Sequence, residues 1–237
     1  MGICDSCHAG CCRAFAVPLT GADIIAIQRA LGLPFEEFVR RVPDPSGRIA
    51  NGGVPHFLFD DSPETPFVIC LTHVPSPFHG HSTKCRFLIE CPPDEDHPLG
   101  RARCGIYAVR PFACRVFPTK FNATHDLAVV CNVPDRLRDN ANPAYTLCPR
   151  PWEPADVDPI QSVQDLAVVK YELAFFRQVA EVWNRSPASW TGFPQFLDIV
   201  YSKRVGREGP DDARADDGPV TLPFSKATKR PALRTAT

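Results

Sequence analysis

The sequence predicts a small, irregular, cysteine-rich α+β domain with a short antiparallel sheet, followed by a C-terminal helical hairpin. Eleven cysteines occur in 237 residues. Short β-type runs fill the middle of the chain, and apolar residues at helical spacing gather after residue 158. We therefore divide the chain into a cysteine-cluster domain over residues 1–157, C-terminal helices packing on it over 158–204, and a disordered polar tail over 205–237.

Two helices are predicted near the N-terminus. Thr20 and Asp23 match a capping box, with a hydroxyl followed three residues later by a carboxylate. The helix that they begin should end at Gly32, just before a proline. It carries the apolar residues Ile24, Ile25, Ile27 and Leu31. A second, short helix is expected over residues 35–42, ended by Pro43.

Four runs of β-branched, aromatic and other apolar residues predict strands over residues 54–60, 67–74, 84–90 and 127–131. The first two should pair antiparallel across the turn-rich segment 61–66. Proline-rich and glycine-rich links separate the other runs, and regular elements tolerate such links poorly. The middle of the chain is therefore expected to be a short sheet surrounded by loops.

The last helical pair has the clearest signal. Asp158 is a suitable N-cap, Pro159 suits the first helical position, and Gln161 would complete a capping box. One apolar stripe follows at spacings of three and four residues, formed by Leu166, Val169, Leu173, Phe176, Ala180 and Trp183. A second helix is predicted over residues 190–201 after the break at Ser186 and Pro187.

Charge and hydropathy exclude several classes of protein. The chain has 26 basic and 27 acidic residues, a formal net charge of −1, so no nucleic acid partner is expected. No run of about 20 apolar residues predicts a membrane span. The N-terminus lacks the pattern of a secretory signal, and free thiols in this number suit the reducing cytoplasm. We expect another protein as the partner, while the oligomeric state stays open.

The spacing of the first cysteines indicates a metal site. Cys4-x2-Cys7-x3-Cys11-Cys12 places four thiols within nine residues, and two thiolates of a C-x2-C turn converge on one ion. In an extended segment the side chains of Cys11 and Cys12 would diverge, so they could serve two metals, or one could lie outside the ligand shell. Five further thiols lie in irregular segments: Cys85, Cys91, Cys104, Cys114 and Cys148.

Several of these thiols have an arginine beside them in the sequence. A four-thiolate zinc site or [4Fe–4S] cluster carries a formal charge of −2, and guanidinium groups would offset that charge and donate hydrogen bonds to sulfur. The arginines are Arg13, Arg86, Arg103 and Arg115. The alternative is that a chain rich in arginine places it beside cysteine without any function.

The remaining cysteines and the histidines have weaker signals for metal binding. Cys70 and Cys131 lie in or beside predicted strands and are expected to be core thiols. Cys91 stays unassigned. His79 and His81 precede Cys85, so either one could supply a ligand or relay protons, although most histidines are surface or core residues.

The chain resembles the YkgJ-type cysteine-cluster family, also called CxxCxxCC, a zinc- or iron-chelating domain whose members are often labelled Fe–S-cluster-containing. The resemblance rests on the first cysteine run through Arg13, on Cys85-x-Phe-Leu, and on Cys104-x-Ile-Tyr-x2-Arg-Pro-x2-Cys-Arg-x-Phe-Pro118. It covers roughly residues 4–150, with one extra residue before Cys11 and an extra Cys91. It implies metal-ligand roles for Cys4, Cys7, Cys11, Cys12, Cys85, Cys104, Cys114 and Cys148.

Eight thiols equal two complete four-coordinate sites, each suited to zinc or to an Fe–S cluster of the 4Fe–4S type. Our first hypothesis is a redox or electron-transfer protein, or an accessory to the modification of a partner protein. The second is a structural zinc module that binds a partner without catalysis. The third is a metal-dependent enzyme with an open coordination position near His79 or His81. No catalytic residue is identified, and whether the protein is an enzyme stays open.

Overall fold

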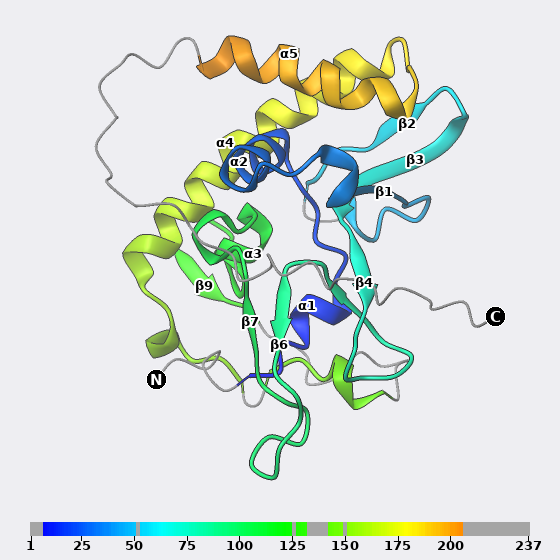
Figure 1. Cartoon of the computed structure of the whole chain (residues 1–237). Helices are drawn as coiled ribbons and strands as arrows, with labels where there is room; N and C mark the ends of the chain where they lie inside the picture. Colours follow the sequence, from blue (N-terminus) through cyan, green and yellow to red (C-terminus); the bar gives the residue numbers. More distant parts are fainter. Residues whose placement is uncertain (1–6, 51–52, 125–126, 132–141, 149–150, 206–237) are drawn as a thin grey trace, which may run out of the picture.

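The computed structural model describes residues 7–50, 53–124, 127–131, 142–148 and 151–205 (Figure 1). It confirms a mixed α+β fold with short antiparallel sheets and two C-terminal helices. The predicted tail lies outside these residues beyond position 205, as does Cys4. No helix within the described ranges has both the length and the hydropathy that crossing a membrane requires.

The first long helix, α2 (Gly21–Leu31), forms as predicted. The Thr20 hydroxyl accepts from the backbone N–H of Asp23, and the Asp23 carboxylate accepts from the N–H of Thr20 at 2.9 Å. Gly32 ends the helix in the left-handed region at φ 62°. The second carboxylate oxygen of Asp23 accepts from the backbone N–H of Phe112 at 2.9 Å, so this buried side chain also joins α2 to the segment after residue 111.

The predicted helix over residues 35–42 was wrong. The chain makes only a 3₁₀ turn, Phe35–Glu37, and then enters strand β1 (Val39–Pro43). The two β-branched valines, Val39 and Val42, suit a strand, and the following proline disfavours the helical conformation in the residue before it. Pairing of Val39 with Leu71 in the sheet supplies the backbone partners that a helix would have supplied.

The main sheet has the order β1-β3-β2 and is antiparallel throughout, with β2 (Phe57–Phe59) and β3 (Ser62–Leu71) paired as predicted. The predicted turn over residues 61–66 is shorter than expected, because the chain turns at Asp60 and Asp61 and strand β3 already begins at Ser62. Beyond Leu71, the chain leaves this sheet and joins a second one.

Three two-stranded hairpins follow the main sheet. They pair β4 (His73–Pro75) with β5 (Thr83–Cys85), β6 (Leu88–Glu90) with β7 (Ala102–Cys104), and β8 (Thr119–Phe121) with β9 (Ala128–Val130). The single strand predicted over 84–90 is therefore two strands, because Arg86 and Phe87 form a turn between them. In Figure 1, β6 and β7 lie low in the centre, β9 lies on the left, and β4 lies right of centre. Short helices α1 (Cys11–Ala14) and α3 (Phe112–Val116) lie among these hairpins, and further 3₁₀ turns cover Tyr107–Val109, Pro143–Tyr145 and Pro154–Asp156.

The C-terminal helices follow the prediction closely. Helix α4 (Pro159–Asn184) begins at an Asp158 side chain that accepts from the N–H groups of Ile160 and Gln161. The Gln161 side chain binds Asp165 rather than closing a capping box. After the 3₁₀ turn Trp190–Gly192, helix α5 (Phe193–Val205) runs back along α4 at the top of Figure 1.

The apolar core lies between the main sheet and helices α4 and α5, and it is dominated by aromatic rings. Phe193 has ring centroids of Phe57 and Trp183 at 5.0 Å each, in edge-on geometry. Side chains of α4 also bind the outer edge of β2. Trp183 Nε1 donates to the Leu58 carbonyl at 2.6 Å, and Asn184 binds the backbone of residues 56 and 58.

Burial makes Asp23 a pH-dependent contributor to stability. Burial raises the pKa of its carboxyl to about 6, despite the hydrogen bonds that it accepts. The native state therefore keeps this proton to higher pH than the unfolded chain does. The free energy of unfolding should fall by roughly 3 kcal/mol in total as the pH rises from well below the unfolded pKa to well above the native one, with about 2 kcal/mol of this fall between about pH 4 and about pH 6.

We predict that urea unfolding at pH 4 and at pH 6.5 will show this fall in the wild type and lose it in Asp23→Asn, which cannot titrate there. The variant should also be less stable at pH 4, since the one oxygen of its amide cannot accept from both the Thr20 and the Phe112 backbone N–H groups. Parallel pH profiles for the two proteins would contradict the assignment.

Candidate metal centre

The thiols predicted as ligands lie at the ends of short elements rather than in long ones. Cys11 and Cys12 open α1, Cys85 ends β5 and Cys104 ends β7. Cys114 lies in α3, whose first N–H is bound by Asp23. The adjacent cysteines are thus helical, whereas the sequence argument assumed an extended segment. A side-chain hydrogen bond joins Cys11 to Cys12.

Four of these thiols form one electrostatic group: Cys11, Cys85, Cys104 and Cys114. We call it the buried thiol group after Cys85, which is buried, while the other three are half-buried. The pKa of the Cys85 thiol is raised to about 11, chiefly by burial, and the nearby Cys104 and Cys11 thiols contribute in the same direction. Burial and the same neighbours also raise the pKa of Cys114. For Cys11 the leading causes are the hydrogen bond to Cys12 and then burial. The fold therefore gathers four thiols from four segments into one apolar place.

A second, smaller grouping contains Cys7 and Cys148. Burial raises the pKa of Cys7, and the Cys11 and Cys148 thiols act in the same direction. Cys7 Sγ accepts the backbone N–H of Ala9 at 3.3 Å, and Ala9 itself lies in the left-handed region at φ 57°. Cys148 Sγ accepts from Trp152 Nε1 at 3.1 Å. Both sulfurs thus already receive N–H donors, the arrangement that stabilises a thiolate.

The donor chemistry fits a thiophilic metal. Neighbouring buried thiols resist ionisation because their negative charges would repel one another, and a bound cation removes that repulsion. In the described part of the chain, however, no three His, Cys, Asp or Glu side chains are arranged as ligands of a single ion. The thiols are gathered, but ligand geometry around one point is not preformed.

The other cysteines divide as follows. Cys70 is fully buried in β3, as predicted for a core thiol, and burial raises its pKa to about 12. Cys131 follows β9 and is only half-buried, so it is less enclosed than expected. Cys91, left unassigned by the sequence, is exposed in the loop after β6. Cys4 lies outside the described residues.

Three of the four arginines predicted to surround the thiols have other partners. Arg13 forms an ion pair with Glu90, and Arg86 forms one with Glu37. Arg115 donates to the backbone carbonyl of Arg110 at 3.0 Å. Arg103 is exposed on β7. Their contact with bound metal stays a prediction.

Arg110 was missed by the sequence analysis as a neighbour of the thiols. Its charge lowers the pKa of Cys104, partly offsetting burial. Its guanidinium lies 4.2 Å from the ring centroid of Tyr107, a side chain that is 65% exposed. Arg110 lies in the Arg-Pro pair between Cys104 and Cys114, but it is not adjacent to either cysteine, so a search for arginines next to cysteines does not find it.

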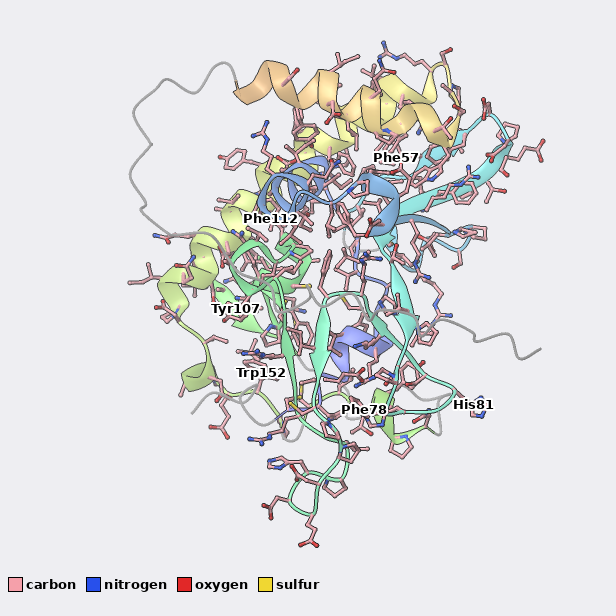
Figure 2. The ribbon with its side chains drawn as sticks, in the orientation of Figure 1. Phe57, Phe78, His81, Tyr107, Phe112 and Trp152 are labelled. Atoms are coloured by element: carbon pink, nitrogen blue, oxygen red, sulfur yellow. The ribbon has the colours of Figure 1, made fainter. Side chains whose placement is uncertain are left out.

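Neither histidine of the His-Gly-His segment lies with the buried thiol group. His79 Nε2 binds the Leu99 carbonyl at 3.1 Å, and Figure 2 shows His81 pointing away from the body of the molecule. His73, on β4 opposite Cys85, is buried enough that its pKa falls to about 4. His73, which the sequence places on a strand, is thus the ladder partner of a predicted ligand cysteine.

Comparison with known proteins gives one match. A family model named CxxCxxCC and described as "Putative zinc- or iron-chelating domain" matches residues 3–132. The matched range contains seven of the eight predicted ligand cysteines and leaves out Cys148. The search of curated proteins found no match, and neither did the search of solved structures.

The close approach of Gly10 to the segment before Cys148 yields a test of the second grouping. A Cβ at Gly10 would lie 1.8 Å from the Thr146 carbonyl oxygen, so the backbone there would have to move. We predict that Gly10→Ala lowers the free energy of unfolding by about 1–3 kcal/mol, as overpacking does.

Gly80→Ala is the matched control, because a Cβ there would meet no atom within 4 Å. Urea unfolding measures both variants. Equal stability of the two would show that the Gly10 contact has no energetic weight.

Proposed function

The chain belongs to the CxxCxxCC family, and on that premise we propose that it is a metal-binding protein whose buried thiol group holds an Fe–S cluster. The single observation that carries this proposal is the mutual interaction of Cys11, Cys85, Cys104 and Cys114 in one buried place. Four thiolates are the complete ligand set of a [4Fe–4S] cluster.

The spacing of the four thiols departs from that of a typical structural zinc site. They are separated by 73, 18 and 9 intervening residues. Structural zinc sites are typically built from cysteine pairs two to four residues apart, and this group contains no such pair. Each thiol instead comes from its own element, namely α1, β5, β7 and α3.

We propose a redox role, in electron transfer or in assisting the modification of a partner protein. When bound, the cluster would supply one-electron chemistry. The chain's own residues would keep water from part of it, because Cys85 belongs to the apolar core together with Leu88 and Ile106, and Cys104 and Cys114 pack against that core. The Arg110 charge beside Cys104 would offset part of the negative charge. Thiolate ligands in this number require a reducing environment, and we therefore propose a cytoplasmic location.

Zinc is the second candidate, favoured at the other grouping. Cys4 and Cys7 form the C-x2-C pair of a structural zinc site in the sequence, and Cys7 interacts electrostatically with Cys148. A zinc ion there would join the N-terminal loop to the segment 146–148. This site would fasten two loops and would need no turnover.

Purification without oxygen tests the identity of the metal. We predict brown protein with about four iron and four sulfide per chain, whose visible absorption is bleached by dithionite. Zinc content is measured in the same sample by elemental analysis. Colourless protein that carries stoichiometric zinc alone would overturn the cluster proposal and leave the structural zinc module.

Serine substitutions test which thiols hold the cluster. Cys85→Ser, Cys104→Ser and Cys114→Ser should each remove most of the iron, because a closed four-thiolate site loses a ligand. Cys70→Ala and Cys91→Ser are the controls, one thiol from the core and one from the surface. Iron content in the controls should match the wild type. Retention of iron in the three test variants would refute the ligand assignment.

A further inference from the structure

The short helix α1 places its side chains on two faces with different partners. Cys11 is the thiol that connects both groupings, since it raises the pKa of Cys7, Cys85, Cys104 and Cys114. Two residues along a helix correspond to a rotation of about 200°, so Arg13 leaves the opposite face of α1. Whatever holds Arg13 therefore sets the direction in which Cys11 points.

Arg13 is held by one carboxylate. Its guanidinium forms an ion pair with Glu90, and the two side chains are only 1% and 2% exposed. Among the described residues, the Arg13 atoms Nε and Nη1 have no hydrogen-bond partner. A buried charge held at a single point depends on that one contact, because no second partner offsets its loss of hydration.

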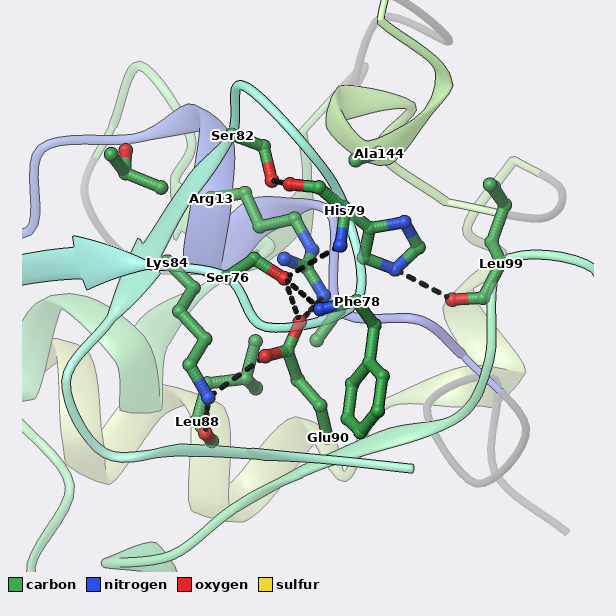
Figure 3. A network of polar contacts seen from close by, with 12 residues as sticks. Arg13, Ser76, Phe78, His79, Ser82, Lys84, Leu88, Glu90, Leu99 and Ala144 are labelled. Atoms are coloured by element: carbon green, nitrogen blue, oxygen red, sulfur yellow. Dashed lines mark hydrogen bonds and ion pairs between the residues drawn. The ribbon is translucent and has the colours of Figure 1, made fainter. Parts of the chain in front are cut away.

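Glu90 is in turn held from several elements (Figure 3). Its carboxylate accepts from the Ser76 hydroxyl at 2.8 Å and lies 2.9 Å from the Lys84 ammonium. Lys84 directly precedes Cys85 on β5, and Glu90 pairs with Ala102 on the strand that ends at Cys104. The Glu90 carboxylate thus connects the elements that carry Cys11 and Cys85, and the backbone of Glu90 pairs with the strand that carries Cys104.

We propose that Arg13 and Glu90 are a positioning pair: their ion pair sets the rotation of α1 and so aims Cys11 at the other thiols. This inference rests on the proposed function, because aiming a thiol has a consequence only where a metal centre forms. Neither residue is assigned a contact with the metal. Their effect passes through the backbone of α1, which also packs against β5.

The test compares Glu90→Gln with Glu37→Gln. The first breaks the buried pair and keeps the shape of the side chain. The second breaks the exposed Arg86–Glu37 pair, which lies equally close in sequence to a ligand cysteine. Metal-free full-length protein is titrated with Co²⁺, and the thiolate-to-metal absorption band reports how many thiolates bind. A competing chelator gives the affinity.

We expect Glu90→Gln to weaken Co²⁺ binding about 10- to 100-fold, the range known for residues that orient metal ligands. The band should also lose intensity per bound ion, a change that lower stability alone would not cause. In metal-free protein, a thiol reagent should modify Cys11 faster in this variant. Glu37→Gln should resemble the wild type in all three measurements.

A double-mutant cycle guards against misfolding of one variant. Arg13→Met leaves Glu90 neutralised by Lys84, and it should weaken Co²⁺ binding as much as Glu90→Gln does. The double variant should lose little more, because the pair acts as a unit. If Glu90→Gln does not fold, Arg13→Met alone decides, and wild-type affinity in that variant overturns the inference.

The remaining outcomes separate the two proposals. Wild-type protein that binds neither Co²⁺ nor an Fe–S cluster refutes the proposed function, and the positioning pair falls with it. Wild-type protein that binds metal, together with a Glu90→Gln variant that matches Glu37→Gln, refutes the positioning pair and leaves the proposed function standing.

Discussion

The repulsion between neighbouring buried thiolates is the constraint on which the rest of this structure depends. Four thiols share an apolar place, and each makes ionisation of the others harder. Without a cation they remain protonated and weakly interacting, so the loops that carry them gain little from meeting. A bound metal ion would attract each thiolate and so replace their mutual repulsion, and the four segments that carry the thiols would then be joined at one point. On the proposed function, such a centre joins the loops that carry these thiols.

The fold separates two kinds of stabilisation. The main sheet and helices α4 and α5 bury a cluster of aromatic rings and need no cofactor to do so. The thiol half contains three short hairpins and two helices of five residues or fewer. Asp23 connects the halves, because its carboxylate caps α2 in the first and binds the N–H of Phe112 beside Cys114 in the second. Aromatic packing dominates the first half, while the second half combines the part of the core that contains Leu88 and Ile106 with polar contacts such as the Arg13–Glu90 pair.

Much of this architecture was readable from the sequence where local signals agreed. The capping box at Thr20 and the N-cap at Asp158 fixed two helix starts correctly. Residues 35–42 were misread because pairing of Val39 with Leu71, a contact far along the chain, overrides a weak local helix signal. The ligand cysteines were suggested by spacing and family resemblance, but their division into two groupings depends on turns such as Arg86-Phe87. The Arg13–Glu90 pair joins residues 77 positions apart, and local patterns carry no information about such contacts.

The side chains of Trp183 and Asn184 have a consequence for the behaviour of the protein in a crowded solution. Strand β2 lies at the edge of the main sheet, where open N–H and C=O groups would offer a template to another chain. Helix α4 occupies that row instead, through the backbone of His56 and Leu58. The same indole and amide that complete the core therefore also cover the β2 edge of the sheet, and they do so with contacts that need no metal.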